Sequence, residues 1–271
     1  MVPNFDVKGK VFVITGAAGI LCSEMARELG ELGARVAVLD LNEERAKEVA
    51  KEICDKGGDA LGLKANVLDK DSLTAARDAV LEKFGTIDVL INGAGGNRPD
   101  ASTSPDLSFF DMPPEALRFV FDLNLVGAIL SSQVFGKVLT DKKEGNIINI
   151  SSMSALRPLT NVLGYSAAKA AVSNFTAWLA GHFALNYSPN IRVNAIAPGF
   201  LLTEQNRFLL KDKETGEMTP RAKHIIGQTP MGRYGTPEEL VGAIVFLASD
   251  AASFVTGTVL CIDGGFGNFA I

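Results

Sequence analysis

The stretch YSAAK, residues 165–169, places Tyr165 and Lys169 four positions apart in a segment with the pattern of an amphipathic helix. Residues at this spacing lie on one face of a helix, one turn apart. A free phenol has a pKa of about 10 and is a poor base at neutral pH, but a neighbouring ammonium group favours the phenolate and lowers that pKa. The pair therefore predicts a tyrosine that exchanges a proton with a hydroxyl or carbonyl group.

A serine hydroxyl is expected beside this pair. Ser152 directly follows the apolar stretch NIINIS (146–151) and precedes Tyr165 by thirteen residues. It is expected to end a strand and to hydrogen-bond the same substrate oxygen as Tyr165. Ser151 is the nearest rival, and the spacing to Tyr165 favours Ser152. Each of these residues alone has an ordinary explanation in packing, solvation or capping, but together they predict a catalytic group.

Short apolar strands alternate with helical patterns over the whole chain. Several strands are apolar nearly throughout, which is typical of strands covered on both faces in a parallel sheet. This order predicts an α/β fold, a doubly wound parallel sheet flanked by helices, as one domain over residues 1–271. Strands are expected at 10–15, 34–40, 59–66, 87–92, 146–151, 191–197 and 258–262, and helices at 23–32, 42–54, 115–139 and 165–185.

Two long connections lack this regularity. Residues 93–114 are rich in Gly, Pro and Ser, and residues 199–235 are mixed in composition and end at TPEEL, in which Thr236, Pro237 and Glu239 form a helix-start signal. Ligands of a doubly wound sheet bind at the carboxyl ends of its strands, where both connections are expected. The second connection is predicted to be a substrate loop or lid.

The segment TGAAGILC (15–22) follows the first strand and opens the first helix, so its glycines predict a phosphate-binding turn. Asp40 ends the second strand, where a carboxylate can accept hydrogen bonds from both ribose hydroxyls of an adenosine. It would repel a 2′-phosphate, and Arg45 lies a turn away, so NAD(H) is favoured over NADP(H). A helix-initiating acid is the competing interpretation of Asp40. NGAG (92–95) leaves room for a flat ring.

Composition limits the class of protein. The chain is 47% hydrophobic and 21% charged, with a formal net charge of −5, a pI of about 5.2 and no Lys/Arg run, so nucleic acid and anionic membrane surfaces are not expected partners. The three cysteines form no CxxC motif, and neither a disulfide framework nor a metal site is predicted. No stretch is expected to approach the roughly 20 apolar residues of a membrane span. A cytoplasmic protein is the expectation.

In their order and spacing these motifs resemble the short-chain dehydrogenase/reductase family from end to end. The resemblance implies a Rossmann-type fold, direct hydride transfer to or from a nicotinamide, a water held by Asn124 in a proton relay, and contact of Lys169 with the nicotinamide ribose. The matching segments are GKVFVITG (9–16), Asp40, NGAG, Asn124 in FDLNL, Ser152, YSAAK, PG (198–199) and DGG (263–265). The implied cofactor-binding residues are Gly16, Gly19, Ile20, Leu21, Asp40, Asn66, Val67, Asn92, Ala94, Gly95, Tyr165, Lys169, Pro198, Gly199 and Thr203.

The phosphate-binding turn departs from the family pattern TGxxxGxG. Ile20 and Cys22 stand where the pattern has glycines, and Gly19 comes one position early. The distances to Gly33 and Asp40 remain normal, so no gap is needed. Cys22 is expected to pack in the interior, with a thiol of lowered pKa near the helix start as the alternative.

Five segments are similar to the subgroup of D-mannonate oxidoreductases, also called fructuronate reductases: INGAGGNRP, NIINISSMSALRPLT, YSAAKAAVSNFTAWLA, NAIAPGFLLTEQNR and TPMGRYG. This resemblance implies NAD-linked, reversible reduction of D-fructuronate to D-mannonate. A polyhydroxylated carboxylate needs a cation and several polar groups. Arg157 is the first choice of cation, Arg98, Arg207 and Arg233 are the others, and Asn97, Gln205 and Asn206 are candidates for the hydroxyl groups. Each arginine alone is explained as well by a surface salt bridge.

Three alternatives stay open. The first is another dehydrogenase of polar substrates, such as a gluconate 5-dehydrogenase. The second is a 3-oxoacyl-carrier-protein reductase, which Asp40 and the acidic pI disfavour. The third is a nucleotide-sensing binding protein without turnover, which the intact catalytic set disfavours. The family resemblance also implies a homotetramer built on helices 115–139 and 165–185 and on the C-terminal segment.

Overall fold

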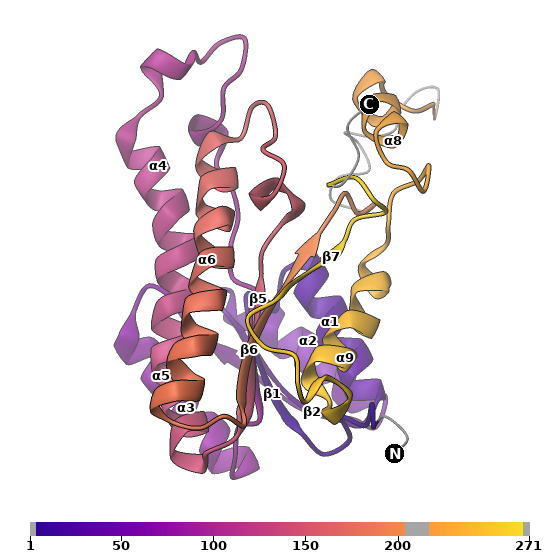
Figure 1. Cartoon of the computed structure of the whole chain (residues 1–271). Helices are drawn as coiled ribbons and strands as arrows, with labels where there is room; N and C mark the ends of the chain where they lie inside the picture. Colours follow the sequence, from indigo (N-terminus) through magenta and orange to yellow (C-terminus); the bar gives the residue numbers. More distant parts are fainter. Residues whose placement is uncertain (1–3, 204–216, 268–271) are drawn as a thin grey trace.

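The computed structural model describes residues 4–203 and 217–267, which are built around a seven-stranded parallel sheet (Figure 1). The strand order is β3-β2-β1-β4-β5-β6-β7, so β1 lies between β2 and β4 and the order reverses there. The strands are β1 (Val11–Thr15), β2 (Arg35–Asp40), β3 (Asp59–Lys64), β4 (Val89–Asn92), β5 (Gly145–Ile150), β6 (Ile191–Pro198) and β7 (Val259–Ile262). The predicted doubly wound α/β sheet is confirmed.

Helices cover both faces of the sheet. In Figure 1, α1, α2 and α9 lie on one side of it and α3, α5 and α6 on the other. Their bounds are α1 (Ile20–Glu31), α2 (Glu43–Asp55), α3 (Lys70–Phe84), α4 (Pro114–Phe121), α5 (Gly127–Lys142), α6 (Leu163–Asn186), α8 (Pro220–Gly227) and α9 (Val241–Ala248). The helix predicted at 23–32 begins at Ile20, because Gly19 is already its N-cap.

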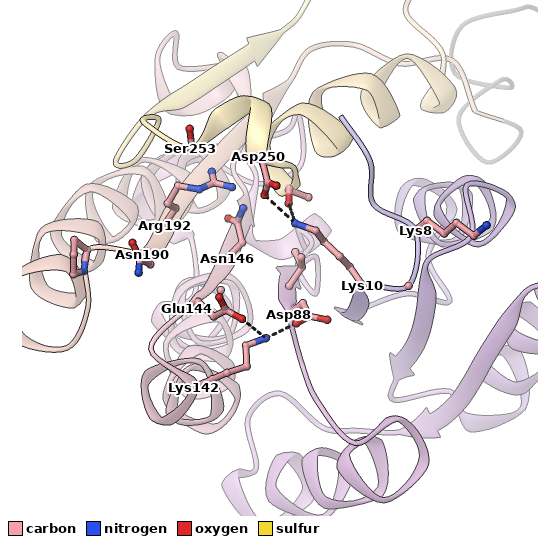
Figure 2. A pocket seen from close by; sticks show the side chains of 15 residues that line it. Lys8, Lys10, Asp88, Lys142, Glu144, Asn146, Asn190, Arg192, Asp250 and Ser253 are labelled. Carbon is pink, nitrogen blue, oxygen red and sulfur yellow. Dashed lines mark hydrogen bonds and ion pairs between the residues drawn. The ribbon is translucent and has the colours of Figure 1, made fainter. Parts of the chain in front are cut away.

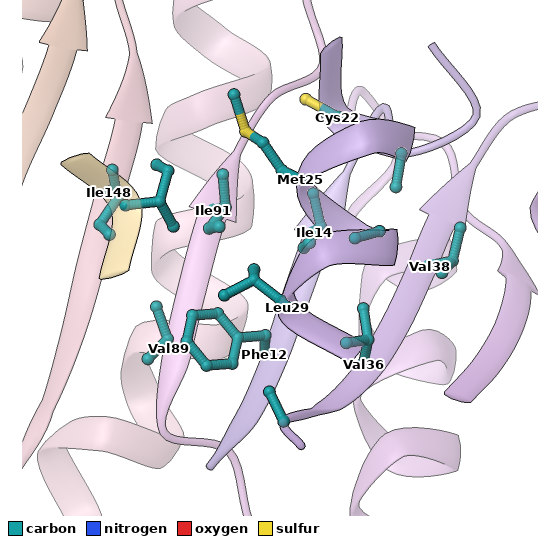
Figure 3. Close-up of a cluster of buried hydrophobic side chains, with 14 of the residues drawn as sticks. Phe12, Ile14, Cys22, Met25, Leu29, Val36, Val38, Val89, Ile91 and Ile148 are labelled. Carbon is teal, nitrogen blue, oxygen red and sulfur yellow. The ribbon is translucent and has the colours of Figure 1, made fainter. Parts of the chain in front are cut away.

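The core explains why the strands read as continuous apolar runs. Phe12 and Ile14 of β1 pack with α1 on one face (Figure 3), whereas Val11 and Val13 belong to the cluster under α3 and α5. All four side chains are fully buried. Burial of one such side chain contributes about 1.5–3 kcal/mol, so both faces hold the sheet rigidly in place.

The predicted helix 115–139 is interrupted by a π-helical turn, Asp122–Val126, between α4 and α5. The whole run Pro114–Lys142 is long and apolar enough to cross a membrane, so the expectation that no stretch reaches this length and hydropathy is wrong. Half of its apolar window is buried within the fold. A helix of a protein core meets the same two criteria, because it too is apolar around much of its circumference.

The two long connections lie beyond the carboxyl ends of the strands. The first contains two short 3-10 helices, Pro99–Ala101 and Phe109–Asp111. The second contains α8, and Leu201 forms an isolated bridge with Gly235. The predicted helix start is present, since Glu239 accepts the backbone N–H of Thr236 at 2.9 Å, although its first turn is 3-10 (Pro237–Leu240) before α9 begins.

Candidate active site

A cleft of about 520 Å³ lies at the carboxyl ends of β1, β2 and β4, where the strand order reverses. This is the edge at which doubly wound sheets bind their ligands. Nine of the residues predicted to bind a cofactor line it: Gly16, Gly19, Ile20, Leu21, Asp40, Asn66, Val67, Ala94 and Gly95. Ala18 and Gly93, which lie within the two glycine-containing motifs, and Ile150 also line the cleft, although none of the three is among the individually predicted cofactor-binding residues.

The turn between β1 and α1 depends on small residues. Gly16 has a φ of +65°, and a Cβ added to it would lie 2.6 Å from the Cα of Ala94. Thr15 joins the two strand ends, because its hydroxyl accepts the backbone N–H groups of Gly93 at 3.2 Å and Ala94 at 3.3 Å. The ends of β1 and β4 therefore meet at the N-terminus of α1, the positive end of the helix dipole.

Cys22 accounts for the unusual composition of this turn. It is buried at the start of α1, and a Cβ added to Gly93 would lie 2.3 Å from its Sγ. Cys22 stands where the family pattern has a glycine in the helix. Its thiol packs against Gly93, a glycine of the facing loop. Burial raises the pKa of the Cys22 thiol to about 12. The structure therefore favours packing, and the alternative of a lowered pKa is wrong.

Asp40 is held at the rim of the cleft by two backbone groups. Its carboxylate accepts the N–H of Ala18 at 3.0 Å and that of Asn42 at 2.9 Å. Each carboxylate oxygen has a second lone pair for a further donor. Arg45, the nearest cation of the helix, already donates to Glu48 at 2.9 Å and to Glu52 at 3.4 Å. The rim is therefore anionic.

The side chain of Asn92 lies behind the cleft and not in its lining. It is 5% exposed, and its Nδ2 donates to Asn149 Oδ1 at 2.8 Å and to Ser132 Oγ at 3.0 Å. These contacts join β4, β5 and α5 within the interior. Asn92 ends β4 as predicted, but its side chain points to the neighbouring strand and not into the cleft.

Pro198, Gly199 and Thr203, also predicted to bind the cofactor, lie at the carboxyl end of β6 and just after it. Pro198 ends β6, and Gly199 follows it so closely packed that an added Cβ would lie 2.5 Å from the Cα of Asp263. Thr203 lines an adjoining cleft of about 420 Å³ with Ile20 of α1. Thr203 therefore lies toward the N-terminus of α1. Pro198 and Gly199 instead pack the end of β6 against the end of β7.

Two of the four predicted catalytic residues, Asn124 and Lys169, lie against Gly95, and Tyr165 and Ser152 adjoin them. A Cβ added to Gly95 would lie 2.6 Å from Asn124 Oδ1 and 3.1 Å from Lys169 Nζ. Lys169 is 4% exposed, donates to Ile150 O at 2.7 Å, and places its Nζ 5.6 Å from the centre of the Tyr165 ring. Ser152 follows β5 and acts on Tyr165 by hydrogen bonding. Side chains from α6, from the π-helical turn and from the segment after β5 are thus brought together.

The electrostatics of Tyr165 differ from the sequence-based prediction. Burial raises the pKa of Tyr165, and hydrogen bonding to Ser152 acts against this shift. Burial also lowers the pKa of Lys169 to about 8. The prediction that Lys169 brings the pKa of Tyr165 below its ordinary value is therefore wrong for this structure. Desolvation is the largest influence on both groups, and it disfavours the charged form of each.

Asn124 sits in the π-helical turn between α4 and α5. Its Nδ2 donates to Gly96 O at 2.7 Å and to Val120 O at 2.8 Å, and its Oδ1 accepts Gly96 N at 3.2 Å. A π turn widens the helix by one residue and is frequent at functional sites. Here it carries the amide across to the loop after β4 and holds that loop in place.

The candidate substrate groups that lie within the described residues are engaged with protein partners. Asn97 donates to Ser102 at 2.8 Å, and Arg98 pairs with Asp100 at 2.6 Å. Arg233 pairs with Glu239 at 2.7 Å. Gln205, Asn206 and Arg207 lie outside the described residues.

Arg157, the first choice of cation, spans two segments. Its guanidinium donates to Phe266 O at 2.9 Å and to Gln228 Oε1 at 2.6 Å, and it lies 4.7 Å from the centre of the Phe266 ring. Arg157 therefore ties the loop after β5 to the segments that follow α8 and β7. An arginine held in this way positions loops whether or not it also contacts a substrate.

A second cavity, of about 530 Å³, lies at the opposite edge of the sheet, near the amino ends of β1, β4 and β5 (Figure 2). Several of its charged groups pair with one another. Lys142 contacts Asp88, and Lys10 lies 3.5 Å from Asp250. Asp88 also accepts the backbone N–H of Val11 at 2.8 Å. These contacts tie strand ends together, and the candidate chemistry lies at the other edge.

Comparison with known proteins agrees with this geometry. A family model described as "Enoyl-(Acyl carrier protein) reductase" matches residues 16–267. The chain belongs to the short-chain dehydrogenase/reductase family of oxidoreductases.

Among its relatives is UxuB of Bacillus subtilis, an uncharacterized oxidoreductase that is 49% identical over 98% of each chain. A crystal structure of a Haemophilus influenzae protein with bound NAD, provisionally assigned as a D-mannonate oxidoreductase, is 47% identical, with a TM-score of 0.91 and coverage of 98% of this chain and 97% of that one. A gluconate 5-dehydrogenase of Burkholderia cenocepacia, solved with NADP and tartrate, is 31% identical, with a TM-score of 0.86 and coverage of 99% of each chain.

Proposed function

We propose that this oxidoreductase is a single-domain, NAD-dependent enzyme that interconverts D-fructuronate and D-mannonate. The observation that carries the proposal is the convergence of Tyr165, Lys169 and Asn124 beside Gly95, next to a cleft that ends at Asp40. Similarity to the NAD-bound Haemophilus influenzae protein supports both the cofactor and the sugar-acid substrate. The unpaired cysteines Cys22, Cys54 and Cys261 support a reducing compartment, the cytoplasm.

The residues that line the cleft fit a dinucleotide. The turn at Gly16 and the start of α1 offer backbone N–H groups to a pyrophosphate, and Asp40 offers carboxylate lone pairs to ribose hydroxyls. Ala94 and Gly95 line the cleft with small residues at the end that adjoins Asn124 and Lys169. When bound there, a nicotinamide would supply the hydride or accept it.

The chain's own residues would move the proton. Tyr165 would donate its phenolic proton to a carbonyl oxygen and take it back in the reverse direction. Lys169, with a pKa of about 8, carries its charge at neutral pH and favours the phenolate that remains. Ser152 would hydrogen-bond the same oxygen and orient it. The rest of the relay would pass by Asn124.

Gluconate 5-dehydrogenase activity is the second candidate, and the likeness to the Burkholderia cenocepacia enzyme favours it. The test is NADH oxidation by the purified protein with D-fructuronate, beside 5-ketogluconate and a 3-oxoacyl thioester. We expect rapid, NADH-dependent loss of absorbance with D-fructuronate. Turnover of 5-ketogluconate alone would contradict the substrate but keep the chemistry. NADH binding without turnover of any of the three would favour the nucleotide-sensing alternative.

Asp40 is expected to set the choice of cofactor. Asp40→Asn keeps an acceptor oxygen at the rim but removes the charge that repels a 2′-phosphate. We expect the ratio of kcat/KM for NADH over NADPH to fall by about tenfold or more, as loss of one close charge repulsion allows. The control is Asp55→Asn, at the exposed end of α2, which should leave the ratio unchanged. An unchanged ratio in Asp40→Asn would show that the carboxylate does not discriminate.

We further propose that the enzyme is a homotetramer assembled partly through α5 and α6. A groove of about 600 Å³ runs between these helices and is lined by Phe175, Trp178 and Phe183. Trp178 is 59% exposed and stacks on His182, with ring centres 4.8 Å apart. A groove lined by aromatic residues with an exposed tryptophan has the character of an association surface.

Trp178→Asp is therefore expected to lower the mass of the assembly, because a carboxylate cannot be buried unpaired in an apolar contact. Light scattering after size-exclusion chromatography measures that mass. Leu32→Asp, at an exposed apolar position after α1, serves as the matched control and should remain a tetramer. A Trp178→Asp variant of unchanged mass would place the contact elsewhere.

A further inference from the structure

Ser152 has a close hydroxyl neighbour that the catalytic motif does not include. Ser154 lies in the short 3-10 helix Met153–Ala155 after β5 and is 1% exposed. Its backbone N–H donates to Ser152 Oγ at 3.1 Å, and its own hydroxyl donates to the same oxygen at 3.0 Å. Two donors from one residue thus converge on the Ser152 hydroxyl.

These two contacts fix the direction in which Ser152 can act. A serine hydroxyl has one proton and two lone pairs. Ser154 occupies both lone pairs, so Ser152 has its single proton left to give. The Ser152 hydroxyl cannot accept a hydrogen bond from another group in the cleft without losing a contact to Ser154. It is therefore set as a hydrogen-bond donor.

We propose that Ser154 is a positioning residue that locks Ser152 as a donor, toward Tyr165 in the free enzyme and toward the substrate oxygen once a substrate is bound. This inference rests on the proposed function, and it names a residue that acts through Ser152 without touching the reacting atoms. Hydrogen bonds arranged in a chain strengthen one another, so the Ser154 hydroxyl also makes Ser152 a better donor. Donation from Ser152 stabilises the phenolate of Tyr165, which is the direction in which Ser152 acts on that group.

The arrangement divides the work between the two hydroxyl groups. In carbonyl reduction, Ser152 polarises the carbonyl oxygen and Tyr165 supplies the proton. In alcohol oxidation, Tyr165 alone takes the proton, because Ser152 has no free lone pair to receive it. Ser154 therefore matters for the protonation equilibrium of Tyr165 even when no substrate is present.

The first measurement follows that equilibrium directly. The chain has three tyrosines, so protein with isotope-labelled tyrosine rings gives three NMR signals, and the Tyr165→Phe variant assigns one of them. We expect Ser154→Ala to raise the pKa of Tyr165 measurably and Ser154→Thr, which keeps the hydroxyl, to restore it. The control is Ser131→Ala, which removes another fully buried serine hydroxyl on α5 and should leave that signal unchanged.

The second measurement is the rate with the substrate that the wild-type enzyme turns over. Loss of one hydrogen bond predicts a decrease in kcat of about five- to tenfold for Ser154→Ala, with the KM for NADH unchanged. A pKa of Tyr165 that is the same in Ser154→Ala and wild type would overturn the inference. This readout needs no substrate, so failure of the substrate assignment and failure of the Ser154 role are separate results.

Discussion

The Tyr165→Phe variant is expected to lose about 10²- to 10⁴-fold in kcat while it binds NADH as the wild type does. Loss of a positioned general acid–base costs a factor of this size. The phenylalanine ring keeps the packing of Tyr165 on α6, so the change removes a proton carrier and little else. Rates of NADH oxidation and the quenching or enhancement of NADH fluorescence measure the two properties separately.

Tyr187→Phe is the matched control for this variant. Tyr187 follows α6 and is 45% exposed, and its ring packs edge-on against Phe183 at 5.5 Å between centres. Removal of its hydroxyl should leave kcat unchanged. A Tyr165→Phe enzyme that keeps more than about a tenth of the wild-type rate would mean that another group supplies the proton. Loss of NADH binding together with turnover would instead show a structural role for the hydroxyl.

The arrangement of the fold could be predicted because it depends on local pattern. The continuous apolar stretches at 10–15, 34–40 and 146–151 correspond to β1, β2 and β5, and each is covered on both faces. The topological rule that ligands bind at the carboxyl ends then places Tyr165, Ser152 and Asp40 at one edge before any side chain is positioned. Spacing and topology were sufficient for this level of the structure.

The direction of side chains and the strength of their charges could not be predicted in this way. Asn92 ends β4 as expected, but its amide turns inward to Asn149, a residue of the neighbouring strand. The guanidinium of Arg157 contacts Gln228, far along the chain. Such contacts depend on segments that meet only in three dimensions, and no local spacing contains them.

The pKa of Tyr165 is the clearest example. A phenol and an ammonium one turn apart on an isolated, hydrated helix attract one another, and the spacing predicts a lowered phenol pKa. In the folded chain the same two groups are desolvated, and burial raises the pKa of Tyr165 and lowers that of Lys169. The catalytic set is therefore assembled at a cost in stability, and that cost can be measured.

Lys169→Met is expected to abolish most turnover and yet to raise the free energy of unfolding at pH 7. The wild-type fold buries an ammonium whose pKa is lowered from 10.5 to about 8. Below pH 8 the lysine is protonated in both the folded and the unfolded chain, so the folded state bears the full cost of desolvating the charge. A shift of this size corresponds to about 3 kcal/mol. We expect a gain of about 2 kcal/mol for methionine, because Ile150 O then loses the donor that Lys169 provides.

The pH dependence gives this prediction its sign. As pH rises from about 8 to 10.5, the folded chain releases the proton of Lys169 before the unfolded chain does, so the unfolded state binds more protons and the wild type becomes more stable. The advantage of Lys169→Met should therefore be largest below pH 8 and disappear near pH 10.5. Urea unfolding across this range measures it, with Lys51→Met at an exposed position as the control. A variant less stable than wild type at pH 7, or a difference that does not change with pH, would show that the buried ammonium stabilises the fold. In that case the placement of Lys169 would carry no conflict between stability and proton transfer.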